Sequence, residues 1–344
     1  MSYKSNFFIK LTHWEYWPTW LVYSPVLFYF FLLSLRARSP FFFTLANPDM
    51  EMGGLYNCSK YRQLKKLPEN LIPKTVFLQS GASLDTALKA LETQNIDFPI
   101  IAKPDRGERG TAVKLIRDGS QLGLYLQESK SDVLLQEFIQ SSFEAGVFYY
   151  RLPSENSGKI PSIVLKDFLT VIGDGKSNLK DLVNEILRGR LVSKGLFKDG
   201  RLNPEEVLAF GEEKLLEPIG NHNRGTKFLD GSHLANPELI RFFDKTSHQL
   251  GTFFYGRVDL KAPSMEDFIQ GKGIKILEIN GVNAEPAHIY DPNAKLFDGI
   301  KKLLKHWGII YQISRENKHL ASSTGSIKEA LDHYNRWRKI KKIA

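Results

Sequence analysis

The segment 256–280, GRVDLKAPSMEDFIQGKGIKILEIN, limits what this chain can fold into more than any other. Charged and apolar residues alternate over 257–260 and again over 274–280, which predicts two strands joined by a turn. If these strands are neighbours, they bring together two carboxylates and an amide: Asp259, Glu278 and Asn280. Oxygen ligands on rigid strands suit Mg²⁺ on a nucleotide's phosphates. An ordinary hairpin with polar residues facing water would show the same pattern, so both interpretations stand here.

The size and charge of the chain narrow its class. With 344 residues it can bury a large core and form more than one lobe. The net charge of +9 is concentrated toward the C-terminal end, between Lys301 and Lys342. Such basic runs are typical of a solvated face, a nucleic-acid site or an anionic membrane contact. Nucleic acid is not expected, because aromatic residues are not interleaved with the basic ones. Cys58 is the only cysteine, which excludes an internal disulfide and fits a reducing compartment.

Residues 16–35 form an apolar run that contains no charged residue. The run is long enough to cross a bilayer as a helix. Aromatic residues that favour the membrane interface lie at its start and arginines follow it: Trp14, Trp17, Trp20, Arg36 and Arg38. Pro25 would kink a spanning helix, so a helix lying in the interface remains an alternative, as does a helix buried on the protein's own body. We expect membrane contact at the cytoplasmic face, with spanning and lying flat both open.

The rest of the chain reads as a connector, a regular α+β region and a C-terminal helix. Residues 41–45 suggest a short strand, and 46–75 a connector. Strands are expected at 76–78, 98–102, 112–116 and 133–139, with a helix that Ser83 caps after the first of them. At the end, Ser326 and Glu329 form a capping box for a basic amphipathic helix. Its predicted apolar stripe consists of Ile327, Ala330, Leu331, Tyr334 and Trp337.

A glycine-containing loop between two of these strands has the features of a phosphate site. Gly107 and Gly110 would let backbone N–H groups approach a polyphosphate, and Lys103 at the end of the preceding strand adds a positive charge. The spacing is not that of a P-loop, and a plain hairpin turn is the alternative. The backbone of 136–139 could contact an adenine edge, and Glu144 could accept hydrogen bonds from ribose hydroxyls.

Several segments together resemble the ATP-grasp fold of carboxylate–amine ligases, the group that includes D-alanine–D-alanine ligase. They are FPIIAKPDRGERGTAVKLI, VLLQEFIQSSFEAGV, GRVDL and ILEINGVNAEP. VIGDGKSNLKDLV and GNHNRGTKFLDGS are similar to the ATP-grasp part of cyanophycin synthetase. The resemblance covers about residues 70–295. It implies an α+β fold of two α+β lobes with ATP between them. The expected division is a membrane-associated segment (1–45), a connector (46–75), an ATP-grasp domain (76–315) and a basic helix (316–344).

The resemblance also implies roles for individual residues. Lys103 would contact the ATP phosphates, the loop Gly107–Gly110 would close over them, and Lys166 and Lys60 would be further phosphate lysines. Glu144 would bind the ribose. The residues expected at the adenine are Gln136, Phe138 and Ile139. The expected metal ligands are Asp259, Glu278 and Asn280, and Arg257 would face the reacting centre.

These expectations define a ligase that joins a carboxylate to an amine through an acylphosphate, with ATP going to ADP and phosphate and with Mg²⁺, or Mn²⁺, as the metal. The alternatives are a kinase of the same fold and a nucleotide-binding membrane adaptor without turnover. His288 and Tyr290 are candidates for the acceptor site, although a core histidine is the more common case. A further group of residues would either hold an anionic substrate or form a basic solvated face: Arg188, Arg190, Asn223 and Arg224. Residues 1–70 are shorter than the family's usual preceding domain, which leaves the substrates open. A homodimer is compatible with the sequence.

Overall fold

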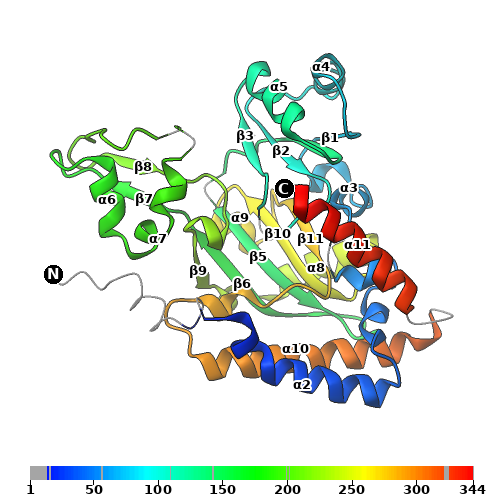
Figure 1. The fold of residues 1–344 in the computed structure, drawn as a ribbon. Coiled ribbons are helices and arrows are strands. Elements are labelled where there is room, and N and C mark those ends of the chain that lie inside the picture. The colour runs from blue at the N-terminus through cyan, green and yellow to red at the C-terminus, as the bar shows by residue number, and fades with distance from the viewer. Residues whose placement is uncertain are drawn as a thin grey trace.

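The protein is built around two antiparallel sheets that lie in separate lobes, with a smaller third unit beside them (Figure 1). The structure is a computed structural model that describes residues 14, 17–55, 57–108, 110–141, 143–198, 200, 202–320 and 325–343. Helices and strands are both abundant and are mixed along the chain. The predicted α+β class is therefore confirmed, whereas the domain boundaries stay a prediction.

The smaller lobe holds a four-stranded sheet in the order β1-β4-β2-β3. Its strands are β1 (Thr75–Leu78), β4 (Val133–Glu137), β2 (Ile100–Pro104) and β3 (Lys114–Ile116). Two helices pack on it, α4 (Leu84–Thr93) and α5 (Gly119–Glu128). Ser83 caps α4 as predicted, since its hydroxyl accepts a hydrogen bond from the Thr86 N–H at 3.2 Å. Strand β4 ends at Glu137, so the two residues expected at the adenine after it leave the sheet.

The larger lobe holds a five-stranded sheet in the order β11-β10-β5-β6-β9. Its strands are β11 (Lys275–Asn280), β10 (Tyr255–Ala262), β5 (Phe143–Tyr150), β6 (Lys159–Asp167) and β9 (Lys227–Asp230). One face packs on α8 (Pro237–Gln249) and α9 (Met265–Ile269) through residues such as Val258 and Phe243. Because side chains alternate along a strand, burying Val258 on this face directs Arg257 and Asp259 to the other. That other face lines the space between the lobes.

Helices α10 (Leu296–Glu316) and α2 (Thr19–Ala37) lie side by side at the base of the larger lobe (Figure 1). The predicted strand at 41–45 is wrong, because this segment is the 3₁₀ helix η2 (Phe42–Ala46). Phe42 and Phe43 are buried there against Trp307 of α10. A short apolar run fits a strand or a buried helical turn equally well by pattern, and packing on α10 decides between them.

Helix α2 occupies most of the predicted apolar segment, although Tyr16 lies outside the described residues. Pro18 stands at its N-cap, where a missing N–H costs nothing, and the helix continues through Pro25. Val22, Val26 and Leu33 are buried, while most of its other apolar side chains are exposed.

The connector is tied to the larger lobe by close backbone contact. It contains the 3₁₀ helices η3 (Glu51–Gly54) and η4 (Glu69–Leu71) and the helix α3 (Lys60–Leu64). The fully buried Asn47 accepts hydrogen bonds from two N–H groups of β10 and its neighbour, and donates to the Tyr255 and Gly53 carbonyls. Gly54 has a positive φ, and a Cβ there would lie 2.6 Å from the Gly281 Cα, so both positions need glycine.

The third unit lies beside the larger lobe and has a small core of its own (Figure 1). Its elements are β7 (Thr170–Ile172), α6 (Leu179–Glu185), α7 (Leu187–Leu196) and β8 (Glu213–Leu215), followed by the 3₁₀ helix η5 (His222–Arg224). Further 3₁₀ turns are η6 (Ser232–Leu234), η7 (Ala287–Tyr290) and η8 (Asn317–His319). This unit supplies one wall of the space between the lobes.

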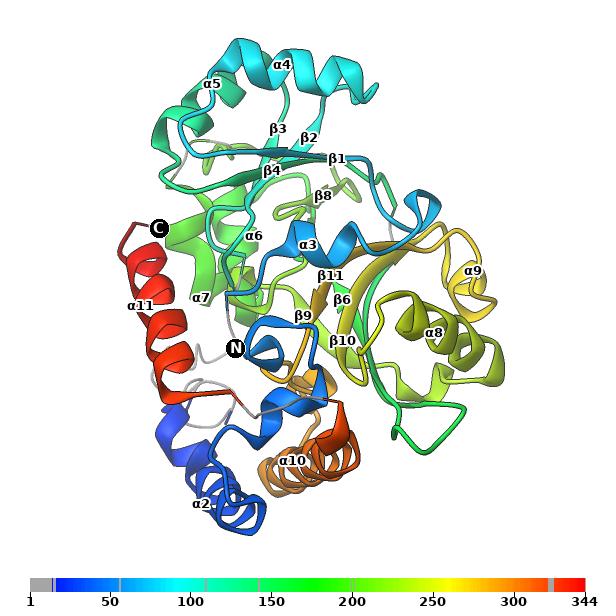
Figure 2. The ribbon, with the colours of Figure 1, turned by 90° about the vertical axis from the view of Figure 1, so that its right-hand side faces the viewer.

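The last helix, α11 (Ile327–Ile343), begins with the predicted capping box. Ser326 N–H donates to the Glu329 carboxylate at 2.8 Å, and Glu329 N–H donates to the Ser326 hydroxyl at 3.2 Å. The described part of its apolar stripe is exposed, with Ile327 at 69% and Leu331 at 55%, whereas His333 is the buried side chain. The Trp337 side chain lies outside the described part. Figure 2 places α11 on the same side of the molecule as α2.

Candidate active site

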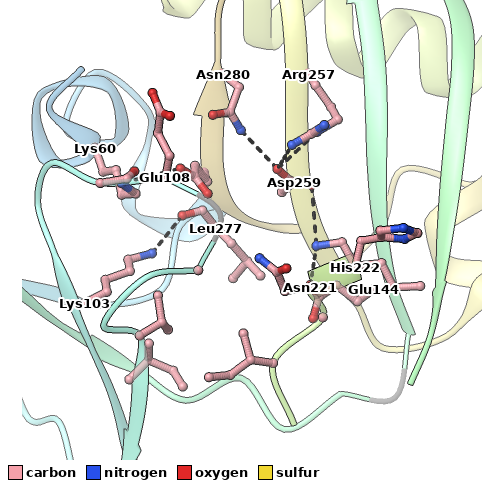
Figure 3. A pocket seen from close by; sticks show the side chains of 18 of the residues that line it. Lys60, Lys103, Glu108, Glu144, Asn221, His222, Arg257, Asp259, Leu277 and Asn280 are labelled. Atoms are coloured by element: carbon pink, nitrogen blue, oxygen red, sulfur yellow. Dashed lines mark hydrogen bonds and ion pairs between the residues drawn. The ribbon is translucent and has the colours of Figure 1, made fainter. Parts of the chain in front are cut away.

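A cavity of about 680 Å³ lies between the two sheets and the third unit (Figure 3). This volume is within the range typical of small-molecule sites. Every residue that the sequence assigned to ATP, metal or the reacting centre lines it: Lys60, Lys103, Gly107, Gly110, Gln136, Phe138, Ile139, Glu144, Lys166, Arg257, Asp259, Glu278 and Asn280. These residues come from segments as far apart as α3 and β11, so only the tertiary structure could bring them together.

The register of β10 and β11 sets the acidic side of the cavity. Asp259 pairs directly with Glu278, and Arg257 pairs with Asn280. Directly opposed residues of an antiparallel pair share a face, so the predicted juxtaposition is confirmed. The register then shifts, because Leu260 pairs with Ile276 and Leu277 is left unpaired. The Leu277 carbonyl instead accepts a hydrogen bond from Lys103 of the other lobe at 3.2 Å.

Asp259 stands among cations and hydrogen-bond donors. Arg257 Nη2 lies 3.2 Å and Asn280 Nδ2 lies 3.1 Å from its Oδ2, while Lys166 Nζ lies 3.5 Å from its Oδ1. Burial by itself would raise the pKa of Asp259, but Arg257 and Lys166 outweigh burial and lower that pKa below its usual value. Asp259 is therefore an ionised carboxylate in the neutral pH range.

Lys166 joins the acidic strand pair to Glu144. Its Nζ lies 2.6 Å from Glu144 Oε1, and both side chains are nearly buried. Burial disfavours the charged lysine, yet Glu144 and Asp259 raise its pKa above the usual value. Sequence reasoning missed Lys261, which lies 3.9 Å from Glu144, donates to the Ile139 carbonyl at 3.0 Å and stands over the Phe138 ring. The alternation of β10 could have identified it, because Lys261 follows Arg257 and Asp259 on the same face.

Lys103 is a buried cation at the opposite side of the cavity. Its Nζ donates to Gln136 Oε1 at 2.9 Å and to the Leu277 carbonyl, and the side chain is almost fully enclosed. Burial lowers the pKa of Lys103 to about 8, with nearby Lys60 acting in the same direction and Glu278 opposing it. Two neutral acceptors do not neutralise this ammonium group, so an anion placed beside it would gain a strong charge-assisted contact.

The glycine loop is held at both of its ends. Lys60 Nζ donates to the Gly107 carbonyl at 2.6 Å and lies 3.6 Å from Glu278 Oε1. Arg224 donates to the Gly110 carbonyl at 2.9 Å. Gly110 has a φ of +69°, and a Cβ there would meet Asn221 Nδ2 at 2.7 Å, so glycine is required at this position.

A second, unpredicted anchor fixes the loop to the connector. Arg106 makes two hydrogen bonds to the Glu51 carboxylate, at 2.7 and 2.8 Å, and a third to the Asn57 carbonyl at 2.6 Å. The hydrogen bond from Arg106 lowers the pKa of Glu51. The signal in the sequence is weak, because the partners are 55 residues apart. The connector therefore positions the glycine loop in addition to its contacts with the larger lobe.

Two neighbouring polar side chains lack partners in the described part of the protein. Both amide atoms of Asn57 and one carboxylate oxygen of Glu108 are buried without a hydrogen bond. They line a small recess that continues to Glu278 and Asn280. Buried polar groups are normally paired, so these atoms have hydrogen-bonding capacity to offer at this end of the site.

The residues proposed for the acceptor side divide into two groups. Tyr290 lines the cavity, and its hydroxyl donates to Glu285 Oε2 at 2.6 Å. His288 does not line it and is buried between Ser162 and Lys302, where burial lowers its pKa to about 4. His288 is therefore the core histidine of the alternative interpretation.

The basic residues 188–224 are likewise divided. Arg188 is buried and donates to the Thr226 carbonyl, and Arg190 donates to the Asn184 carbonyl, so both support the third unit and neither lines the cavity. Arg224 contacts the glycine loop as described. The side chain of Asn223 lies outside the described residues.

Glu285 is a cavity-lining carboxylate that sequence reasoning missed. Among the described residues it forms no ion pair, and burial raises its pKa above the usual value. Arg257 Nη1 lies 3.5 Å from its backbone carbonyl, which places Glu285 beside the arginine of the predicted reacting centre. An acidic side chain with a raised pKa next to such a centre is suited to accept a proton.

The donor set on β10 and β11 suits a hard divalent cation. Two carboxylates lie opposite each other in register, and the Asn280 amide already points to Asp259. No group of three or more His, Cys, Asp or Glu side chains with metal-binding geometry occurs in the described part of the chain. If Asp259, Glu278 and Asn280 held a metal, they would offer oxygen ligands only, which would favour Mg²⁺ or Mn²⁺ over softer metals.

Comparison with known proteins gives structural likenesses at low sequence identity. No family model matches this chain, and no curated protein does. It is structurally similar to a D-alanine–D-alanine ligase from Bacillus anthracis, with 16% identity, a TM-score of 0.42, and coverage of 79% of this chain and 71% of that one. A D-Ala:D-Ser ligase from Enterococcus faecalis gives 14% identity, a TM-score of 0.42, and coverage of 74% and 61%.

A bifunctional glutathione synthetase from Pasteurella multocida gives 15% identity and a TM-score of 0.39, with coverage of 72% of this chain and 36% of that one. This chain therefore spans about a third of the synthetase and three fifths of the D-Ala:D-Ser ligase. The solved structures that it resembles are ATP-grasp ligases, as the sequence motifs predicted.

Proposed function

We propose that this protein is an ATP-grasp ligase that joins a carboxylate to an amine and converts ATP to ADP and phosphate. One observation carries the proposal. The paired strands that hold Asp259 and Glu278 face a cavity whose opposite wall carries the buried, unneutralised Lys103 and the anchored glycine loop. Acidic ligands for a cation and lysines for phosphate, on two sides of one cavity, are what the transfer of a phosphoryl group needs.

ATP would lie between the two sheets. Its phosphates would contact Lys103, Lys60 and Lys166, below the loop Gly107–Gly110. The adenine would lie against the segment that follows β4, whose residues are Gln136, Phe138 and Ile139. The ribose would contact Glu144, which requires that this carboxylate share its interaction with Lys166. Asp259, Glu278 and Asn280 would hold Mg²⁺, which neutralises phosphate charge when it is bound.

The reaction would proceed in two displacements. An oxygen of the substrate carboxylate attacks the γ-phosphorus, the bond to the β,γ-bridging oxygen breaks, and ADP leaves. The amine nitrogen then attacks the acyl carbon of the acylphosphate, inorganic phosphate leaves, and the nitrogen gives up a proton. Arg257, held by Asp259, would stabilise the oxyanion that forms on the carbonyl oxygen. The loop over the phosphates would keep water from hydrolysing the acylphosphate.

Glu285 would take the proton from the attacking amine. It lines the same cavity as Arg257, and its raised pKa improves its basicity toward an ammonium group. The hydroxyl of Tyr290 would orient the carboxylate. Glu285→Gln should lower the rate of amide formation and leave formation of ADP in the first step less affected.

The experiment that tests the reaction class supplies ATP, Mg²⁺, a panel of carboxylic acids and hydroxylamine. A ligase releases ADP slowly with its carboxylate alone, and hydroxylamine traps the acylphosphate as a hydroxamate. The right amine should stimulate ADP release strongly. Formation of a phosphorylated alcohol with no hydroxamate would make the protein a kinase. ATP binding without ADP formation under any of these conditions would make it a nucleotide-binding adaptor.

Glu278→Gln is the diagnostic variant. It preserves the shape of the side chain but removes one charge from the cation site, so both ADP release and hydroxamate formation should be abolished. The matched control is Glu238→Gln on α8, where the exposed carboxylate pairs with the exposed Arg241. The control should retain full activity, and equal loss in both variants would remove Glu278 from the site.

A further inference from the structure

The structure leaves a continuous apolar face on α2 open to solvent. Seven large apolar side chains of this helix are exposed: Trp20, Leu21, Leu27, Phe28, Phe31, Leu32 and Leu35. Phe28 is 65% and Trp20 is 70% exposed, although both are residues that normally find cover. A clustered apolar surface of this size is typical of an interaction site.

The opposite face of α2 packs against α10. Val26 packs with Leu303, and Phe30 lies edge-on to Trp307 with ring centroids 4.9 Å apart. Arg36 stands over the Tyr311 ring at 5.9 Å. These pairs advance together along both chains, so α2 and α10 run in the same direction and remain in contact over most of the length of α2.

This contact favours one of the two orientations that the sequence left open. With 19 residues α2 is about 28 Å long, which is enough to reach across a hydrocarbon core. To span a bilayer, however, α2 would have to leave α10 and expose Leu303 and Trp307 to water. A helix that keeps this contact can only lie along the membrane surface, with its outer face among the acyl chains.

The surrounding charges favour a lipid surface with anionic headgroups. On α2, its C-cap and α10, the exposed basic side chains are Arg36, Arg38, Lys301, Lys305 and Arg315, whereas Asp298 is the exposed acidic side chain among the described residues of these elements. The apolar stripe itself carries no charge. In an anionic leaflet the apolar side chains of such a helix would lie among the acyl chains, and the basic side chains would reach the anionic headgroups.

Helix α11 lies on the same side of the molecule as α2 (Figure 2). Ile327, Leu331 and Tyr334 are exposed at helical spacing, and Arg336 and Arg338 are exposed as well. The two helices come from opposite ends of the chain, and each exposes apolar and basic side chains; α11 exposes Glu329 and Asp332 as well.

We propose that the outer faces of α2 and α11 form a monotopic docking surface for an anionic lipid bilayer, on which α2 lies flat and does not span. The proposal is independent of the ligase reaction, because none of these exposed side chains lines the cavity. It places the enzyme at a membrane surface with its cavity in the aqueous phase.

The test is flotation of the full chain with vesicles of phosphatidylcholine, with and without phosphatidylglycerol. The parent protein should float, and more so with phosphatidylglycerol. Phe28→Ser combined with Phe31→Ser should lower the partition coefficient at least about tenfold, because two large side chains lose their burial in lipid. The matched control combines Leu124→Ser and Phe210→Ser, two apolar side chains that are 62% and 88% exposed elsewhere on the protein, and should float like the parent.

Further variants test the basic rim and α11. Lys301→Glu combined with Lys305→Glu should remove the preference for phosphatidylglycerol. Ile327→Ser combined with Leu331→Ser should also lower flotation, and unchanged flotation would overturn the inclusion of α11. A parent protein that stays unbound with both vesicle types would overturn the whole proposal. If light scattering then shows a dimer that Phe28→Ser with Phe31→Ser converts to a monomer, the face belongs to a second copy.

Cysteine labelling in intact cells separates lying from spanning. Ser5→Cys and Ser39→Cys, which come before and after α2 in the sequence, should each be protected from a membrane-impermeant maleimide and should each react after lysis. Labelling of only one of the two in intact cells would show that α2 spans. Cys58 gives little background because burial raises the pKa of its thiol to about 12.

Discussion

Raising the pH from 7 to 9 should weaken ATP binding through one buried group, Lys103. Burial lowers the pKa of this lysine from 10.5 to about 8 in the ligand-free protein. Because a lysine is charged below its pKa, Lys103 loses its charge as the pH rises through about 8. A bound phosphate beside it would favour the ammonium form, so binding ATP at higher pH requires uptake of a proton.

The magnitude follows from the pKa. With a pKa of about 8, roughly nine tenths of Lys103 is charged at pH 7 and roughly one tenth at pH 9. If only the charged form binds phosphate well, the Kd for ATP rises about tenfold over this interval. The same linkage gives uptake of about 0.1 proton per ATP at pH 7 and about 0.9 at pH 9.

Calorimetry in two buffers of different ionisation enthalpy measures both quantities. Lys103→Met should weaken ATP binding at pH 7 by at least about 1–3 kcal/mol. At pH 9 this variant should take up no proton when it binds ATP. Lys114→Met is the matched control, since Lys114 is half exposed and pairs with Glu128. A Kd for the parent protein that stays constant between pH 7 and 9, with no proton uptake, would refute the reasoning.

The lowered pKa of Lys103 should also make the folding stability of the ligand-free protein depend on pH, and this dependence serves as a control. A lysine whose pKa is lowered in the folded state opposes folding while it is charged, so the stability of the ligand-free protein should rise between pH 8 and 10.5. Lys103→Met should remove this rise and should not destabilise the fold at pH 7. Loss of ATP binding in that variant would then be a loss of the contact and not of the structure.

Three further variants test other parts of the site. Arg257→Ala should lower the rate of the amide-forming step by about 10²–10³ with little change in the Kd for ATP, which single-turnover kinetics and calorimetry separate. Asn47→Ala removes four buried hydrogen bonds and should lower the free energy of unfolding by about 3 kcal/mol or more in urea titration. Glu51→Gln should raise the KM for ATP several-fold, because the glycine loop loses its ion pair with Arg106; an unchanged KM would mean that this anchor is not needed.

The local features of the fold were accessible from the sequence because they depend on near neighbours. Alternation over 257–260 and 274–280 predicted two adjacent strands, and the structure pairs Asp259 with Glu278 across them. The caps at Ser83 and Ser326 involve groups three residues apart. The resemblance of the motifs to ATP-grasp ligases named each cavity-lining residue proposed for ATP and metal, because each residue could be matched to a motif along the chain.

Other features depended on partners that are distant in the chain, and only the tertiary structure decided them. The register shift leaves the Leu277 carbonyl without a strand partner, and Lys103, which is 174 residues away in the chain, donates a hydrogen bond to it. Glu51 and Arg106 are 55 residues apart, and Glu285 is 28 residues from Arg257. The apolar run at Phe42 forms a 3₁₀ helix because its side chains are buried against α10, which covers the same apolar surface that a strand in a sheet would cover.

The orientation of the terminal helices was decided in the same way. The composition of residues 16–35 determines that α2 needs an apolar environment. It does not determine which face of the helix packs on the protein and which face is left exposed. Packing on α10 buries Val26 and leaves Phe28 outside, and the contact of α11 with the connector buries His333 and turns Leu331 to solvent. A hydrophobic pattern specifies how much surface must be covered, whereas the choice of covering partner is a property of the whole folded chain.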